Sequence, residues 1–297
     1  MGFFDDVGDF FSDAADAVWG GVTTVVNGIL DTLESIFGGL LDALAWIVEG
    51  ILSIPWIGGF LRDLWNLILT IVWSLVSIVD FILTLLGIMP EKRLKLCVII
   101  QLDESGNPVA SDAQVMTYLQ MAIDVFKSEP NVRVLPLGPF VYSSAFQDTP
   151  KASDDYYTTM TSPSSAKTLD VNCGGQGLAD DLGPAGSRFN YEMGRYCFWG
   201  NFRRLIGYGS PIAAFTVRRF TGGDIGCSMG PLADYVLVDF SARSPRTLPH
   251  EMGHACNLWH ESDASNLMTK TSDGGTGTNL SRWQKALLRS SRHVTYF

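Results

Sequence analysis

The chain has 297 residues, of which 46% are hydrophobic and 18% charged, so it has enough apolar side chains for a buried core, and general disorder is excluded. Its formal net charge of −10 at pH 7 excludes a nucleic-acid binder that relies on neutralising phosphates. Residues 1–90 hold eleven acidic residues and one basic residue, whereas residues 91–297 hold twenty of each. The sequence therefore predicts two regions of different physical character.

The N-terminal segment does not have the composition of a secretory signal peptide. Residues 1–20 contain five aspartates and no lysine or arginine. We therefore expect the protein to be membrane-associated or to be exported by a route that uses no signal peptide. The chain has five cysteines, too few for a disulfide-built scaffold, and one of them must be unpaired within the chain. A bridge among three of them is open: Cys173, Cys197 and Cys227.

Residues 1–90 have the apolar periodicity of helices. In residues 3–18, aromatic and aliphatic side chains recur every three or four positions and aspartates fill the gaps. Residues 64–89 contain a single charge, Asp80, and as one helix they would exceed the roughly 30 Å hydrocarbon thickness of a bilayer. Residues 40–61 are a weaker second candidate, because two acids and a proline interrupt them.

This pattern leaves two interpretations of residues 1–90. They form either a membrane-inserting helical hairpin or a bundle that serves self-assembly or packing. Ionised carboxylates oppose entry into lipid, and burial raises their pKa, so the first interpretation predicts stronger insertion in mild acid. Asp80 and Glu49 lie deepest in the two candidate spans and would control this dependence.

Residues 91–297 have the mixed pattern of an α/β or α+β domain. Ser111 is predicted to cap a helix that continues to about Ser128, with its apolar residues on one face. Runs rich in β-branched and aromatic residues predict strands at 93–102, 132–137, 212–220 and 235–240.

Three of the four histidines fall within the eleven residues HEMGHACNLWH, from position 250 to position 260. His250 and His254 are four residues apart, so on a helix they share one face, as two ligands of one zinc ion must. Glu251 follows the first of them and is placed to act as a base on a water at the metal. This spacing predicts a helix that carries both ligands and the base.

The third histidine needs a change of chain direction. On a continuous helix His260 would lie about 15 Å along the axis from His250, too far to share an ion. The helix must therefore end after His254 and turn back. Asn257 is suited to this break, because asparagine tolerates the left-handed conformation better than any residue except glycine. Three imidazoles would leave a fourth coordination position for water, as in catalytic zinc sites.

The segment resembles the signature of the metzincin metalloproteases, H-E-x-x-H-x-x-G-x-x-H followed by a methionine turn. Four residues match it: His250, Glu251, His254 and His260. Asn257 takes the place of the signature glycine, and Met268 in the segment SNLM resembles the methionine of the turn. Lys270 stands where some members have a metal-binding tyrosine.

The resemblance covers residues 93–297 and implies an α+β fold with a mixed twisted sheet, an active-site helix and a C-terminal helix over residues 280–291. It implies that residues 235–240 form the edge strand that holds substrate, and that Met268 forms an apolar floor under the metal. Apart from the resemblance, we expect Met252 and Trp259 to pack against the sheet, and His293 to lie at the surface.

Taken together, the sequence predicts a zinc-dependent endopeptidase of metzincin type in residues 91–297, preceded by an all-α hydrophobic region in residues 1–90. His250, His254 and His260 would hold Zn²⁺, and Glu251 would be the general base. The expected partners are a protein or peptide substrate, and either a lipid membrane or further copies of the chain through residues 1–90, with no nucleic acid. The alternative is a delivered toxin, or a self-assembling structural protein, whose protease domain is secondary or vestigial.

Overall fold

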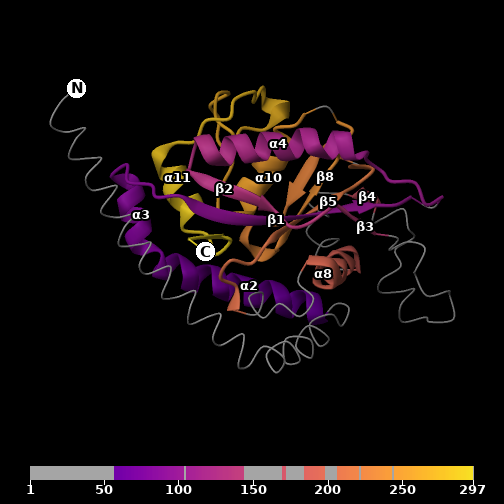
Figure 1. Ribbon diagram of the computed structural model, residues 1–297, viewed down its shortest axis with the longest axis horizontal. Helices are drawn as coiled ribbons and strands as arrows, with labels where there is room; N and C mark the ends of the chain where they lie inside the picture. Colours follow the sequence, from indigo (N-terminus) through magenta and orange to yellow (C-terminus); the bar gives the residue numbers. More distant parts are fainter. Residues whose placement is uncertain are drawn as a thin grey trace.

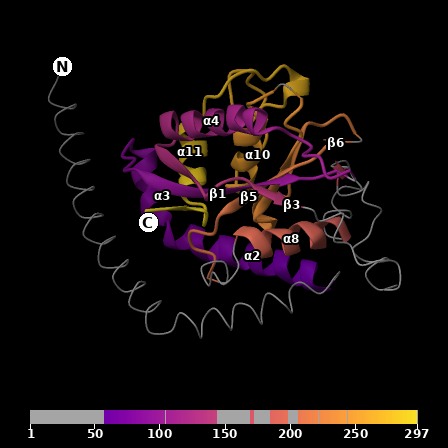
Figure 2. The same cartoon turned by 45° about the vertical axis from the view of Figure 1, so that its right-hand side comes forward.

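The computed structural model describes residues 57–103, 105–143, 169–171, 184–197, 206–220, 222–242 and 244–296. Within them, a mostly parallel sheet lies between layers of helices (Figures 1 and 2). The main path of the sheet has the order β2-β1-β5-β8-β7. Its parallel strands are β1 (Lys92–Gln101), β2 (Val132–Pro136), β5 (Ile212–Thr216) and β8 (Tyr235–Val238).

The remaining strands are short. One of them, β7 (Gly226–Ser228), pairs antiparallel with β8 at the edge of the sheet. Two others pair with β1, namely β3 (Val141–Ser143) and β9 (Val294–Thr295). A separate pair is formed by β4 (Asp170–Val171) and β6 (Arg219–Phe220). The predicted strand at 212–220 is therefore two strands, and the predicted edge strand at 235–240 is wrong, because β8 is an interior strand.

The helices are distributed over both faces of the sheet. Their bounds are α4 (Asp112–Ser128), α8 (Pro184–Cys197), α10 (Thr247–Ala255) and α11 (Arg282–Arg289), with 3₁₀ turns η1 (Gly230–Leu232) and η2 (Thr271–Asp273). As predicted, Ser111 caps α4, where it forms a capping box with Gln114. The sheet is mostly parallel and has helices on both faces, so the fold is mixed α/β, one of the two classes that the sequence pattern left open, whereas the resemblance implied α+β.

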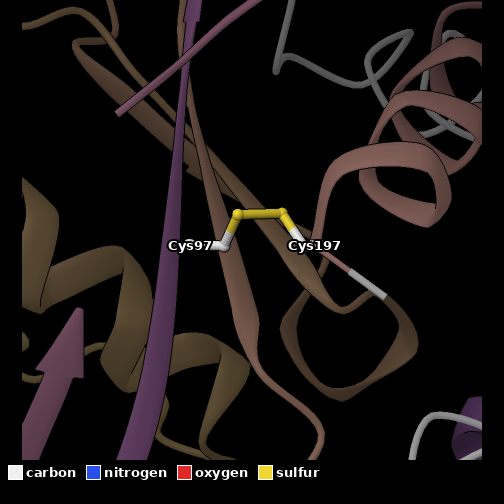
Figure 3. The surroundings of a disulfide bond; sticks show 2 residues. All are labelled: Cys97 and Cys197. Atoms are coloured by element: carbon white, nitrogen blue, oxygen red, sulfur yellow. A yellow bond between two sulfur atoms is a disulfide. The ribbon is translucent and has the colours of Figure 1, made fainter. Parts of the chain in front are cut away.

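The central strand β1 is buried on both faces, as expected for a parallel strand with helices on either side. Side chains such as Leu96 and Val98 pack on the core shared with α4 and α10. Cys97 and Ile99 alternate with them and face the core shared with α8. A disulfide from Cys97 to Cys197 joins β1 to the end of α8 (Figure 3).

Among the described cysteines, two of the three candidates for a bridge are disulfide-bonded. Cys197 pairs with Cys97, which was not among the candidates. Cys227 is also disulfide-bonded, and Cys256 is a free, buried thiol. Cys173 lies outside the described residues, as do residues 3–18, Glu49 and most of the candidate span at 40–61.

Residues 64–89 do not form one helix. The chain forms α2 (Ile57–Val76) and α3 (Ile78–Leu85), which are separated at Ser77. In the described part of the chain, no single helix has the length and hydropathy needed to cross a bilayer. The bent pair 64–76 and 78–85, with 58° between its halves, passes that test of length and composition when taken together.

Of the four described side chains that α2 buries, three are polar and the fourth is Leu69. Arg62, Asn66 and Thr70 lie one helical turn apart and are all buried. The Asn66 side chain donates to the Leu232 carbonyl at 3.1 Å, and the Trp73 indole donates to the carbonyl of Ile206 at 2.8 Å. Hydrogen bonds to backbone carbonyls therefore connect α2 to η1 and to the segment before β5.

Asp80 attaches α3 through a buried charge network. Its carboxylate lies 3.0 Å from the Lys92 ammonium and 3.0 Å from the Arg289 guanidinium, and it accepts a hydrogen bond from the Tyr296 hydroxyl. Burial raises the pKa of Asp80, but the two cations and the hydrogen bonds together lower it by more. The net shift of the pKa is therefore downward. In the folded protein this carboxylate is therefore paired with two cations, whereas the membrane-inserting interpretation required it in lipid with a raised pKa.

We expect Asp80→Asn to destabilise the fold by about 3–5 kcal/mol, because it leaves Lys92 and Arg289 buried without their anionic partner. Since the folded pKa of Asp80 is lowered, this stabilisation is fully present above its ordinary pKa and is lost as pH falls through the lowered value. Urea unfolding at pH 7 measures it, with the exposed Asp124→Asn as control. Equal unfolding midpoints for wild type and Asp80→Asn would refute the network's role.

Candidate metal centre

Helix α10 carries two of the three histidines and the glutamate. It has nine residues, and because His250 and His254 are four residues apart, they lie on one face, one turn apart. His250 is buried, His254 is half-buried, and Glu251 is buried between α10 and the strand β7. The helix therefore brings both ligand candidates and the carboxylate to one place, as the spacing predicted.

The helix ends at Ala255, and Asn257, two residues later, has a φ of 71°, in the left-handed region. The Leu258 amide donates to the Gly253 carbonyl at 3.0 Å, and the Asn257 amide donates to the carbonyl of His254 at 3.0 Å. These two bonds form a Schellman motif, in which a left-handed residue closes the helix and reverses the chain. The reversal brings the exposed His260 back beside the helix.

The three imidazoles converge through their Nε2 atoms. His254 Nε2 lies 3.2 Å from His250 Nε2 and 3.1 Å from His260 Nε2. Two nitrogens bound to one tetrahedral zinc ion are separated by roughly 3.3 Å, given metal–nitrogen bonds of about 2.0–2.1 Å. The separations therefore match those of ligands that share a single metal ion.

Backbone carbonyls fix which nitrogen of each ring faces the cluster. His250 Nδ1 donates to the Leu267 carbonyl at 2.7 Å, and His254 Nδ1 donates to the Leu258 carbonyl at 2.8 Å. A carbonyl oxygen only accepts, so in both rings Nδ1 carries the proton and the neutral ring presents an Nε2 lone pair. These two lone pairs repel at 3.2 Å unless a cation lies between them, and this fits a metal site.

Burial keeps these rings neutral. It lowers the pKa of His250 to about 3 and that of His254 to about 4, despite the hydrogen bonds to carbonyls. The pKa of His260 is lowered for the same reason, with Lys270 adding to the effect. Neutral imidazole is the form that binds a metal, so the cluster needs no deprotonation at neutral pH.

Met268 lies directly against α10, in the turn that the sequence singled out. It is fully buried, and a Cβ added to Gly253 would stand 2.7 Å from its sulfur. Glycine at this position therefore lets the turn approach the helix between the two histidines. The Asn266 side chain accepts from the Met268 amide at 2.8 Å and donates to Gln284 on α11, which fixes the turn from its other side.

Arg246 is a site residue that the sequence did not reveal. Its guanidinium donates to the carbonyls of Asn266, Leu267, Thr269 and Gly277. The Leu267 carbonyl also accepts from His250 Nδ1, so one oxygen connects Arg246 to a ligand candidate. The acceptors are backbone atoms 20–31 residues downstream, and no side-chain pattern in the sequence marks them.

The histidines and Glu251 line one cavity of about 390 Å³. Burial raises the pKa of Glu251 to about 8, and the nearby Asp224 adds to the rise. A Cβ on Gly226 would stand 2.5 Å from Glu251 Oε1, so the backbone of β7 passes directly over the carboxylate. Lys270 also lines the cavity, at the position of the absent tyrosine.

Two expectations near the site are wrong. Trp259 is 80% exposed, because the chain reversal at Asn257 turns it away from the sheet, whereas Met252 is fully buried as expected. His293 is buried rather than at the surface, and its ring donates to the Ser210 carbonyl at 2.7 Å. The fourth histidine is therefore a core residue that is hydrogen-bonded away from the metal cluster.

Comparison of the sequence with protein-family models and with curated proteins finds no match. The geometry by itself establishes a cluster of three histidines that can hold a metal ion.

We expect the Asn257 backbone conformation to control metal affinity. Asn257→Gly should bind zinc as wild type does, because glycine adopts a φ of 71° without strain. Asn257→Val should bind more weakly by at least roughly tenfold, since a β-branched residue resists positive φ. Competition with a chromogenic chelator measures the affinities, and equal affinity in all three proteins would contradict the prediction.

We expect Arg246→Met to loosen the turn that holds the Leu267 carbonyl. Zinc affinity should fall by roughly 10–100-fold, the usual effect of removing an outer-shell partner. The exposed Arg93→Met serves as the matched control and should leave affinity unchanged. If Arg246→Met binds zinc as tightly as wild type, Arg246 has no positioning role.

Proposed function

We propose that the protein is a zinc-dependent endopeptidase. The observation that carries this proposal is the convergence of three imidazole Nε2 atoms and the Glu251 carboxylate on a single cavity. Three neutral nitrogen ligands suit zinc and leave a coordination position for water, the arrangement of catalytic rather than structural sites. The metzincin resemblance of the segment from His250 to Met268 supports the same reaction class.

Zinc bound by the three histidines would supply Lewis-acid activation of water and of the scissile carbonyl. Glu251 accepts a proton from the attacking water and later delivers it to the departing amine. Burial raises the pKa of this carboxyl, and a cation bound by the neighbouring histidines would lower it again, which favours the ionised form that acts as a base. Met268 and Arg246 take no part in proton transfer, since they hold the turn against α10.

The edge strand β7 is the best-placed element for binding a peptide. It ends the main path of the described sheet, and its residues Gly226, Cys227 and Ser228 line the cavity. An extended peptide can add to such an edge through backbone hydrogen bonds, with no requirement on its sequence. The substrate-holding strand is thus assigned to β7 in place of the interior β8.

We expect Glu251→Gln to retain one zinc per chain and to lose at least about a hundredfold in kcat on casein, because it removes the base and no ligand. His250→Ala should lose both the metal and the activity. Chelation should abolish wild-type hydrolysis, and added zinc should restore it. Metal content by atomic emission and casein cleavage measure the two properties separately. Glu251→Gln cleaving casein as fast as wild type would refute the mechanism.

A further inference from the structure

Helices α2 and α3 have an outer face made of exposed apolar side chains. The hydrogen bonds and ion pairs of Asn66, Trp73 and Asp80 with other described residues lie on the opposite side of both helices. The outer face is defined by twelve residues: Leu64, Trp65, Leu67, Ile68, Ile71, Val72, Leu75, Val76, Ile78, Val79, Ile82 and Leu86. In both views α2 lies on the opposite side of the molecule from α4, with α3 continuing from it at the rim (Figures 1 and 2).

The two helices are amphipathic, but their polar side is buried and their apolar side is exposed. Their buried side carries polar groups, including Arg62, Asn66, Thr70 and Asp80, while large aliphatic side chains point outward. A helix at a water-exposed surface buries its apolar stripe and exposes its polar one. Contiguous exposed apolar patches of this extent mark interaction sites. The sequence of α2 and α3 is therefore suited to an apolar environment on the outer face.

The chemistry of the outer face fits lipid better than a protein surface. Residues 64–79 contain no charged residue, and the members of the face are aliphatic apart from Trp65. Protein interfaces have a polar rim and about one hydrogen bond per 100–200 Å², whereas acyl chains need none. The chain has a net charge of −10, so zwitterionic headgroups suit it better than anionic ones.

The buried contacts decide how the helices meet the lipid. To be surrounded by hydrocarbon, α3 would have to withdraw Asp80 from Lys92 and Arg289, leaving charges unpaired in an apolar medium. Bound to the protein by these ion pairs, the helices can present only their outer face. We propose that this face lies in the interfacial region of a zwitterionic bilayer, so that the folded protein binds membranes on one side without spanning them.

The test is flotation of the full-length protein with phosphatidylcholine vesicles. The variant replaces Ile71, Leu75 and Ile82 together by serine; each residue is more than half exposed, so the substitutions remove little packing. The matched control is Met116→Ser, which removes an exposed apolar side chain from α4 on the opposite side. Thermal unfolding in the absence of vesicles shows that each protein is folded.

We expect the triple variant to lose at least about tenfold in vesicle partition coefficient, while Met116→Ser binds as wild type does. The proposal is overturned if wild type remains in the soluble fraction, or if the triple variant floats as wild type does. A wild-type dimer that ignores vesicles and becomes a monomer in the triple variant overturns it in favour of self-association. These outcomes are independent of peptide hydrolysis, since no residue of the metal centre is changed.

Discussion

The metal centre depends on one reversal of the chain, at Asn257. Helix α10 can present two imidazoles on one face but not a third six residues later, because the axis carries His260 away. The left-handed conformation at Asn257 closes the helix with two backbone hydrogen bonds and brings His260 Nε2 to 3.1 Å from His254 Nε2. The same reversal places the Leu258 carbonyl where it accepts from His254 Nδ1. A single backbone conformation thus supplies the third ligand candidate and orients the second.

The sequence was sufficient for this part of the site because its geometry is local. His250, His254 and Asn257 lie within one helix and its end, where periodicity and residue preference determine position. Arg246 could not be found in this way. It acts on backbone carbonyls that a long loop brings back to it, and carbonyls are common to every residue. The disulfide from Cys97 to Cys197 is similar, since 100 residues separate its ends and only the packing of α8 on β1 brings them together.

Hydropathy predicted one helix over residues 64–89 because it measures the composition of a segment and not the direction of the helix axis. The inward orientation of Asp80 is set by a contact with a residue far along the chain. Asp80 was the only charge in that run, and its partners Lys92 and Arg289 lie outside it. A lone acid among apolar residues can be accommodated in two ways: its pKa is raised so that it is neutral, or it is paired with a buried cation. The sequence alone does not distinguish them, because one of the two cationic partners lies 209 positions away.

The boundary predicted near residue 90 marks a change of composition, and ion pairs cross it. Asp80 on one side is bound to Lys92 and Arg289 on the other, and all three side chains are buried. Separating α3 from the sheet would leave two buried cations without their anionic partner, which is costly. We therefore expect the described helices to stay attached to the part of the chain that carries the metal centre. An environment that binds the outer face of α2 and α3 would therefore also hold the metal centre at a fixed orientation to it. Because polar contacts attach these helices to the sheet, binding of their apolar face to a membrane would orient the whole protein.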